Sequence, residues 1–423
     1  MGLSATLYSG ISGLQGNATA MSVIGNNISN SNTIGFKSSS SIFSDVLAST
    51  IASSSGTSQV GRGVEVSSVK TDFAQGSFMT TSSATDLSIE GTGFFMVTTP
   101  TADQTLYTRN GAFTFDNDGY LVNAEGYRVL GRAFNSDGSL SSGSLTPIHA
   151  NLNTQIPAKM TENVTLATNL DAGSELVGPF DLADPSNTSN YSTPTVVYDS
   201  LGNTHTAMTY FTMTAEQTWD WSTVVNSSEL DASVAGADEL TLVGSGSLVF
   251  DSDGELISGS PATTTAGALV WDNDANAGQQ ITLDFQTTQF RSDSVVISQE
   301  QDGYASGELV DVAISTDGIV SASYSNGETL DIATIGLATF SNPDGLVKSG
   351  GSLYTASTES GEPSIGTPGV SQGYLYTNSL ELSNVDLAQE FVNMVTIQNG
   401  YSACSKVITT TDEMLQELIN MKR

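Results

Sequence analysis

The two ends of the chain carry apolar side chains at helical spacing, and this feature constrains the fold most strongly. Residues 1–36 contain no Asp, Glu, Lys or Arg. Within them an apolar stripe runs along Leu7, Ile11, Leu14, Ala18, Met21 and Ile28. The three-and-four spacing predicts a helix from about Ser4 to Ile28. A surface helix normally presents charge to water, so we expect the outer face of this helix to contact protein.

The other end repeats the pattern. Its stripe consists of Leu387, Phe391, Met394, Tyr401, Ile408, Leu415 and Ile419, and it is broadened by Ile397, Cys404, Met414 and Leu418. Ser383 with Asp386 three residues later resembles a capping box and predicts a helix from about Asn384 to Asn420. Two apolar helices at the ends predict that the termini pack on each other and on other copies of the chain.

The N-terminal helix is rich in glycine. Gly10, Gly13, Gly16 and Gly25 each cost about 1 kcal/mol relative to alanine, so the helix should not persist alone. We therefore expect it to depend on tertiary or intersubunit packing. An ordinary helix packed only within one chain is the alternative.

Charge is spread unevenly. The chain has a net charge of −33, and residues 38–385 carry almost all of it. Such a surface repels nucleic acid and anionic lipid, so neither is an expected partner. No apolar run reaches the ~18 residues of a membrane helix, so no membrane insertion is expected. Met1–Gln15 has no basic start and interleaves Gly and Ser with apolar residues, which is unlike a cleaved signal peptide.

The middle of the chain has the pattern of a β protein. From Val64 onward, short alternating runs are separated by turn residues. Asp-Gly pairs, which favour tight hairpin turns, begin at Asp118, Asp137, Asp253, Asp302, Asp317 and Asp344. Asp116–Gly119 and Asp251–Gly254 also resemble calcium loops, but neither continues to the required glutamate. Hairpin turns are therefore the expectation, with calcium as the alternative.

Candidate catalytic side chains are few. The chain has one cysteine and two histidines, Cys404, His149 and His205. His205 lies in a strand-like run and His149 in a linker-like segment, with no nucleophile, base and orienting acid to combine. Cys404 is expected to be a small packing thiol. We therefore expect no catalytic, cofactor or metal site, and no enzyme activity.

Composition suggests a nested order of domains. The expected fold is mainly β and multidomain, with long coiled-coil-like helices at termini that pack together. The expected parts are a helical core (1–30 and 384–423), a loosely specified connector (31–71 and 376–383), an inner β domain (72–146 and 290–375) and an outer β domain inserted into it (147–289).

Several short motifs resemble the flagellar rod and hook proteins, the axial proteins of the bacterial flagellum. They are Gly25-Asn26-Asn27-Ile28-Ser29-Asn30, Thr33-Ile34-Gly35-Phe36-Lys37, Asp72-Phe73-Ala74-Gln75-Gly76, Gly91-Thr92-Gly93-Phe94-Phe95, Tyr107-Thr108-Arg109-Asn110-Gly111 and Leu382-Ser383-Asn384-Val385-Asp386-Leu387. The inserted segment with Val197-Tyr198-Asp199-Ser200-Leu201-Gly202-Asn203-Thr204-His205 looks like the outer domain of the hook members, which distal rod members lack.

This resemblance implies a self-assembling tubular polymer. Its terminal helices would surround an export channel, and the tube would act as a flexible universal joint that transmits motor torque from rod to filament. The implied partners are copies of the chain, the distal rod, the hook cap, the hook-filament junction proteins and the flagellar type III export apparatus. The implied location is the extracellular hook at the flagellar basal body.

Phe43 and Leu47 look like the aromatic-plus-aliphatic spacing that rod and hook substrates present to the export gate. Simple anchoring of the connector is the other reading of this pair. For the whole chain, a distal rod component and a secreted β-rich adhesin or binding module are the alternative functions.

Overall fold

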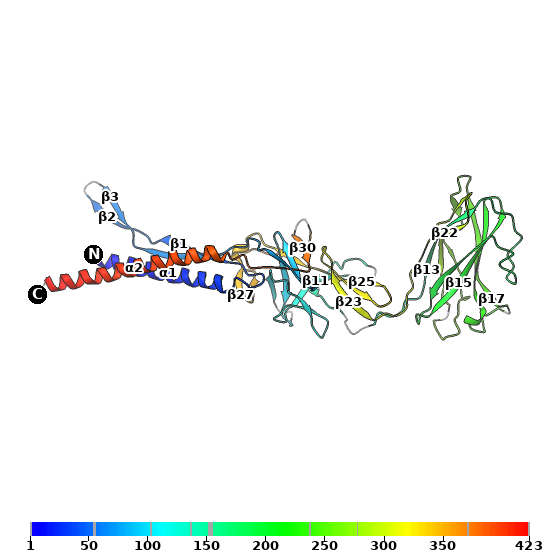
Figure 1. Cartoon of the computed structure of the whole chain (residues 1–423), viewed down its shortest axis with the longest axis horizontal. Coiled ribbons are helices and arrows are strands. Elements are labelled where there is room, and N and C mark those ends of the chain that lie inside the picture. Colours follow the sequence, from blue (N-terminus) through cyan, green and yellow to red (C-terminus); the bar gives the residue numbers. More distant parts are fainter. Residues whose placement is uncertain are drawn as a thin grey trace. The chain divides into compact units, whose positions relative to one another are not determined.

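The computed structural model describes residues 2–53, 56–101, 104–135, 138–150, 155–236, 238–276, 278–369 and 372–421. The chain forms two compact units. Unit 1 comprises residues 1–152, 312–322 and 330–423, and unit 2 comprises residues 153–311 and 323–329. Figure 1 shows the elements of both units.

The α-helices of the described residues lie at the two ends of the chain, as the stripes predict. They are α1 (Gly2–Ser29) and α2 (Leu387–Met421), which run side by side in unit 1 (Figure 1). The capping box expected at Ser383 was wrong. The Asp386 carboxylate caps α2 instead, because its Oδ1 accepts the backbone N–H groups of Ala388 at 2.9 Å and Gln389 at 3.2 Å. Neither described helix is long and apolar enough to cross a membrane.

The segment after α1 is more ordered than its Ser-rich sequence suggests. It contains β1 (Ser39–Asp45), β2 (Ser49–Ser53), β3 (Gly56–Val60) and β4 (Val64–Thr71). β1 pairs with β4 and β2 pairs with β3, both antiparallel. The long-range pairing of β1 with the valine-bearing β4 supplies order that the local composition of this connector does not indicate.

The largest sheet lies mainly in unit 1. Its main path follows β23 (Leu309–Ile314), β24 (Ile319–Tyr324), β25 (Thr329–Ile335), β11 (Arg128–Ala133), β7 (Phe94–Thr98), β8 (Thr105–Thr108), β28 (Leu353–Thr355) and β27 (Val347–Gly350). The strands attached beside this path are β9 (Thr114–Phe115), β10 (Leu121–Val122), β12 (Thr146–Pro147), β26 (Leu337–Thr339) and β29 (Ser364–Gly366). A short 3-10 helix, η2 (Pro343–Gly345), precedes β27.

Two short strand pairs bring the end of the chain back to its beginning. β30 (Tyr374–Thr377) pairs with β6 (Leu87–Glu90), and β31 (Ser379–Glu381) pairs with β5 (Phe78–Thr80). Glu381 is the last residue of β31 and lies six residues before α2 begins. The start of α2 is therefore fixed to strands that follow α1 in the sequence.

Unit 2 is built from two sheets that share one core. One sheet contains β19 (Ala262–Thr263), β20 (Thr282–Phe285), β13 (Asn163–Asp171), β21 (Thr288–Phe290) and β22 (Val295–Gln301). The other contains β14 (Tyr191–Tyr198), β15 (Thr204–Ala215), β16 (Thr218–Asn226), β17 (Leu240–Phe250) and β18 (Leu256–Ser258), with the 3-10 helix η1 (Ser227–Glu229) after β16.

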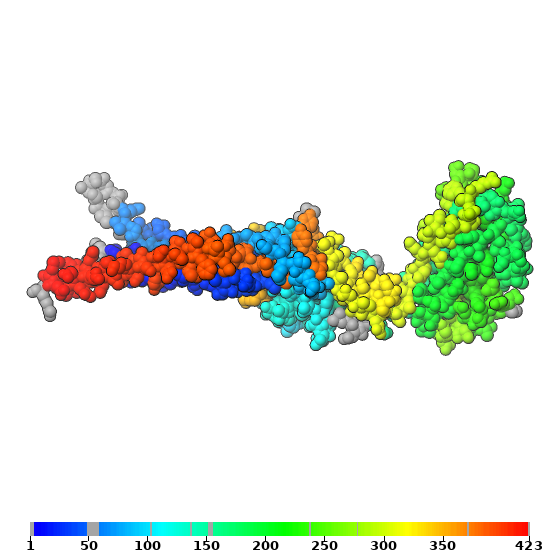
Figure 2. All heavy atoms as spheres, viewed as in Figure 1, coloured from blue at the N-terminus to red at the C-terminus, as the bar shows by residue number. Residues whose placement is uncertain are grey.

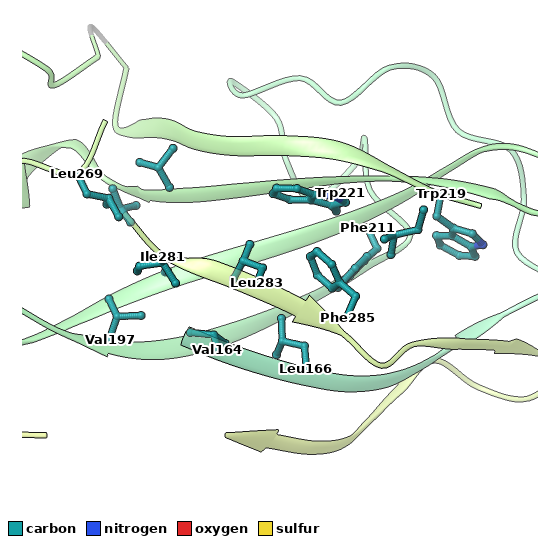
Figure 3. Packing of buried hydrophobic residues seen from close by; sticks show 14 of the residues in the cluster. Val164, Leu166, Val197, Phe211, Trp219, Trp221, Leu269, Ile281, Leu283 and Phe285 are labelled. Atoms are coloured by element: carbon teal, nitrogen blue, oxygen red, sulfur yellow. The ribbon is translucent and has the colours of Figure 1, made fainter. Parts of the chain in front are cut away.

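The core of unit 2 is large and aromatic. Phe285 from one sheet contacts Phe211 and Trp221 from the other, with ring centroids 6.0 and 5.2 Å apart (Figure 3). The chain's three tryptophans, Trp219, Trp221 and Trp271, all lie in this core. Tryptophan fluorescence therefore reports on unit 2.

Strand pairing in unit 2 continues past residue 289, where the outer domain was expected to end. Residue 289 lies inside β21, and β22 pairs antiparallel with β13. The next strand, β23, belongs to the sheet path of unit 1.

The Asp-Gly pairs do not all form the same turn. Positive φ angles occur at Gly119, Gly254 and Gly318, as expected after Asp118, Asp253 and Asp317. Asp137 lies outside the described residues. Asp344 instead belongs to η2, and the Asp302 carboxylate accepts the backbone N–H groups of Glu162 and Asn163, both at 2.9 Å. For these last two pairs the hairpin expectation was wrong, because each aspartate joins a different local structure.

Candidate assembly site

α1 and α2 meet along a seam of small residues. A Cβ atom built on Gly13 would lie 2.6 Å from Cys404 Sγ, and one on Gly10 would lie 2.8 Å from Ile408 Cγ1. Further along, a Cβ on Gly400 would lie 3.1 Å from Asn17 Oδ1. From Gly10 through Gly13 to Asn17 on α1, the contacts on α2 run backwards from Ile408 through Cys404 to Gly400. The two helices are therefore antiparallel. The missing side chains allow the backbones to approach closely.

This seam gives the glycines a second role. The sequence interpretation treated them as weak points of the helix, whereas Gly10 and Gly13 are positions where a larger residue does not fit. Cys404 fills the space opposite Gly13, and Asn17 Nδ2 lies 3.9 Å from its sulfur. Cys404 is therefore a packing thiol that is only partly buried.

The α1 stripe lies beside the seam, whereas Ile408 of the α2 stripe lies in it, opposite Gly10. The buried residues of α1 are Gly10, Gly13, Gly16, Ala20, Ile24 and Asn27, and none of them is a stripe residue. Every residue of the two predicted stripes keeps part of its surface exposed. The most exposed members are Ile11 at 49 %, Phe391 at 54 % and Ile419 at 66 %. α2 also lies open along the side facing the viewer in Figure 2. A single subunit therefore leaves part of both stripes uncovered.

A buried ionic cluster fixes the helices to the β part of unit 1. Glu381 Oε1 accepts Lys37 Nζ at 2.7 Å and the backbone N–H of Gly76 at 2.9 Å, and Glu381 Oε2 lies 3.5 Å from Arg109 Nη1. The side chains of Lys37 and Glu381 are fully buried. Lys37 Nζ also donates to the Ala74 carbonyl oxygen at 2.7 Å. We call Lys37, Arg109 and Glu381 the Glu381 clamp.

Arg109 connects the clamp to the sheet. Its Nη2 donates to the Gly91 carbonyl oxygen at 2.7 Å and its Nη1 to that of Ile89 at 3.2 Å. Its guanidinium lies over the ring of Phe94, 5.3 Å from the centroid. The guanidinium thereby holds one loop and two strands to the same carboxylate.

The segment after α1 and the segment before α2 are bonded to each other at this cluster. The Gly35 backbone N–H donates to the Glu381 carbonyl oxygen at 2.8 Å, and the Ser38 backbone N–H donates to Asn384 Oδ1 at 2.8 Å. Deeper in the pair, buried Asn27 bonds both backbone groups of Ser39 through its side chain, at 2.7 and 3.0 Å. The exit of α1 and the entry of α2 are thus a single hydrogen-bonded unit.

Burial opposes charge in the clamp. Burial lowers the pKa of Lys37, and the nearby Glu381 carboxylate works in the opposite direction. Burial likewise lowers the pKa of Arg109, again opposed by Glu381. One carboxylate therefore supports two buried cations. Breaking such a buried pair costs about 3–5 kcal/mol, although an apolar replacement of the whole pair is often neutral.

The clamp also unites the motifs that carry the family resemblance. Lys37 ends the second of them, Ala74 and Gly76 lie in the third, Gly91 in the fourth, and Arg109 in the fifth. Asn384, two residues into the last motif, donates through Nδ2 to the backbone oxygens of Asp72 at 2.9 Å and Ala74 at 3.2 Å.

Sequence reasoning missed this cluster. One signal was available, since Lys37 is the only charged residue before Asp45. Lysine side chains are mostly exposed, however, so this signal alone does not indicate a buried carboxylate partner. The partner itself could not be identified, because it lies 344 residues away.

The two residues of the expected export-gate motif have different environments. Phe43 lies in β1, and its ring approaches α1, with Cε1 3.1 Å from the Cβ position of Gly16. Leu47 is 87 % exposed. The folded subunit therefore covers part of Phe43 and leaves Leu47 open.

His205 takes part in a polar network of unit 2. Its Nδ1 lies 2.8 Å from Glu229 Oε2 and its Nε2 lies 3.3 Å from Asp199 Oδ2, while its ring stacks on Trp271 at 3.6 Å. Burial raises the pKa of Asp199, but hydrogen bonds from Asn203, Asn273 and His205 outweigh it and lower the pKa to about 2. This network closes a turn beside the core.

The other candidate side chains are separate from His205. His149 Nε2 contacts the carbonyl oxygen of Asp118 at 2.8 Å in unit 1. Within the residues that the structure describes, no group of three or more His, Cys, Asp or Glu is placed to hold a metal ion.

Comparison with protein families gives matches along most of the chain. Residues 7–37 match the flagella basal body rod protein family, and residues 88–169 match the D1 domain of flagellar hook protein FlgE/F/G. Residues 169–304 match the D2 domain of flagellar basal body protein FlaE, and residues 372–421 match the C-terminal family of flagellar basal body rod proteins FlgEFG. The fold and these matches define an axial protein of the bacterial flagellum.

Named relatives show which family within this class the chain belongs to. The chain is 34 % identical to flagellar hook protein FlgE of Borreliella burgdorferi, over 99 % of both chains. It is 33 % identical to FlgE of Salmonella typhimurium, over 97 % of this chain and 98 % of the relative. The chain belongs to the flagellar hook protein family, whose members are structural proteins of the flagellum.

A solved structure agrees with the fold. The crystal structure of Helicobacter pylori flagellar hook protein FlgE2 aligns with 71 % of this chain and all of its own, at a TM-score of 0.53 and 17 % identity. The mainly β, multidomain fold is thereby confirmed.

Proposed function

We propose that many copies of this chain assemble into a flexible tube, the flagellar hook, which transmits motor torque from rod to filament as a universal joint. The observation that carries the proposal is the pair of stripes on α1 and α2. They are apolar and every member is at least partly exposed in one subunit, although the seam between the helices is already filled. Neighbouring subunits would cover them and surround a central export channel.

The proposed layout follows from the same arrangement. The paired ends form a coiled-coil-like core, the strands of residues 31–71 and 376–383 connect it to an inner β domain, and the inserted unit 2 forms the outer domain. The Glu381 clamp would hold the core to the inner domain. Acidic outer surfaces rich in Gly, Ser and Thr favour sliding contacts over tight, dry ones.

The proposed partners are further copies of the chain, the distal rod, the hook cap and the hook-filament junction proteins. Export by the flagellar type III apparatus, without a cleaved signal peptide, would bring the chain to the cell exterior, with Phe43 and Leu47 as the gate-binding pair. Both residues are exposed in the folded subunit, Phe43 at 39 % and Leu47 at 87 %, which leaves the pair accessible for such recognition. A torque-bearing polymer requires no catalytic residue, cofactor or metal.

Electron microscopy tests assembly directly. We expect the full-length chain, concentrated at high salt, to form tubes, and a chain lacking residues 1–30 to remain dissolved with its tryptophan fluorescence unchanged. Tubes formed by the shortened chain would refute a helix-driven polymer. Curved tubes favour the hook over the alternative, a distal rod component, and unit 2 supports the same choice because rod members lack such an insertion.

A further inference from the structure

A small internal cavity lies between the two sheets of unit 2. Its volume is about 10 Å³, and every residue that lines it is at most 6 % exposed. Most of the wall is apolar, and Val164, Val197 and Leu283, which Figure 3 labels, form part of it. The cavity therefore belongs to the core of unit 2. We call it the Thr195 cavity.

Four threonines interrupt this apolar wall. Thr195 comes from β14, Thr209 from β15 and Thr223 from β16, and Thr264 directly follows β19. All four are at most 2 % exposed. A buried hydroxyl group costs stability unless it is hydrogen-bonded, and valine would fill the same space without a polar atom. The four hydroxyl groups therefore need partners inside the core.

Three of these hydroxyl groups do not satisfy one another. Thr195 Oγ1 is buried and has no hydrogen-bond partner in the described part of the chain. Thr209 Oγ1 and Thr223 Oγ1 lie 2.9 Å apart and share one hydrogen bond. A hydroxyl group has one hydrogen to donate, so whichever of this pair donates, the hydrogen of the other has no acceptor among the described residues.

Thr264 adds a further hydrogen of this kind. Its Oγ1 accepts the backbone N–H of Ile281 at 2.9 Å, and no described residue accepts its own hydroxyl hydrogen. Unpaired hydroxyl hydrogens and oxygen lone pairs thus line one small space. A molecule that both accepts and donates hydrogen bonds would pair with them together.

We propose that the Thr195 cavity is a binding site for one buried water molecule, held by the threonine hydroxyl groups. A buried water needs roughly 10–15 Å³ of free volume and two to four polar partners, and this cavity offers both. Its volume excludes a larger ligand. No charged residue lines the wall, so the site does not suit an ion.

The water connects the two sheets of the core. It accepts the Thr195 hydrogen and one further hydroxyl hydrogen, and it donates to the remaining lone pairs. β14, β15 and β16 belong to one sheet, whereas β19, which Thr264 follows, belongs to the other. This inference concerns unit 2 alone and is independent of the proposed assembly.

Oxygen-17 magnetic relaxation dispersion on the full-length chain counts water oxygens held inside the protein. Thr195→Ile removes the hydroxyl group and fills the cavity, so this variant should hold one water fewer than the unmodified chain. Thr168→Val is the matched control. The Thr168 hydroxyl is buried in the same unit and lies 2.8 Å from that of Thr287, but Thr168 does not line the cavity, so the control should lose no water. An equal count in the unmodified chain and Thr195→Ile would overturn the proposal.

A second variant keeps the test decisive if Thr195→Ile does not fold. With a water present, Thr195→Val removes one of its partners, and the urea midpoint of the tryptophan transition should fall. In a dry cavity the same change would remove an unpaired hydroxyl group, and the midpoint should rise. The tryptophans report on this core directly, since all three belong to it. An unchanged or raised midpoint would contradict a bound water.

Discussion

Replacing Gly13 by alanine tests the close approach of α1 and α2. In an isolated helix, alanine stabilises by about 1 kcal/mol relative to glycine. At this position the new Cβ would lie 2.6 Å from Cys404 Sγ, which is too close for any normal contact. Overpacking of this kind costs about 1–3 kcal/mol. The overlap should outweigh the propensity gain, so we expect Gly13→Ala to destabilise the helix pair by up to about 2 kcal/mol.

Gly25 provides the matched control. It lies in the same helix, and a Cβ built on it meets no atom within 4 Å. Gly25→Ala should therefore stabilise the helix by up to about 1 kcal/mol. Thermal unfolding followed by far-ultraviolet circular dichroism measures both variants, because the helical signal comes from α1 and α2. Equal stabilisation by the two substitutions would refute the close seam.

Cys404 can be used to verify the contact itself. Cys404→Ala removes the sulfur that the new methyl group would meet, so Gly13→Ala should be tolerated better in that background than in the unmodified chain. The difference is a coupling free energy, which contacting residues show and distant ones do not. A coupling free energy of zero would mean that Gly13 and Cys404 are not in contact.

Three further outcomes are expected. Glu381→Gln should lower the free energy of unfolding of unit 1 by about 3–5 kcal/mol in a urea titration, while the tryptophan transition of unit 2 stays in place; a shift of the tryptophan transition alone would contradict this. Asp199 has a folded pKa of about 2 against an ordinary value of 3.8, so its stabilisation of unit 2, about 2 kcal/mol, is complete above pH ~4 and lost as the pH falls towards 2. Asp199→Asn should remove this part of the pH dependence of the tryptophan transition, and an unchanged pH profile would be evidence against it. Raising salt should promote association, seen by light scattering, because it screens the net charge of −33, and dissociation by salt would count against this reasoning.

The terminal helices were predictable because their signal is local. The spacing of residues such as Leu7, Ile11 and Leu14 is that of a helix, and α1 and α2 lie close to the expected ranges. The stripes were also expected to meet other copies, which remains a prediction. The seam between the helices could not be predicted from this pattern. It depends on Gly10 and Gly13, which have no side chain and therefore do not contribute to a hydrophobic periodicity.

Long-range pairing was not predictable from one sequence. The turn after Asp118 depends on neighbouring residues and was predicted correctly, whereas the partner of Lys37 is selected by the folded chain. β22 illustrates the same limit, because its pairing with β13 joins residues more than a hundred positions apart. Periodicity identifies strands, but it does not state which strands meet.

The measurement that tests the central claim most directly is electron microscopy of a variant altered only in its exposed stripe. Phe391→Ser with Ile419→Ser removes two apolar side chains that one subunit leaves 54 % and 66 % exposed, and Ile257→Ser, at an equally exposed position of unit 2, is the control. We predict tubes from the unmodified chain and from the control, and dissolved subunits with intact helices from the double variant. Tubes formed equally well by the double variant would contradict the claim that these stripes hold the polymer together.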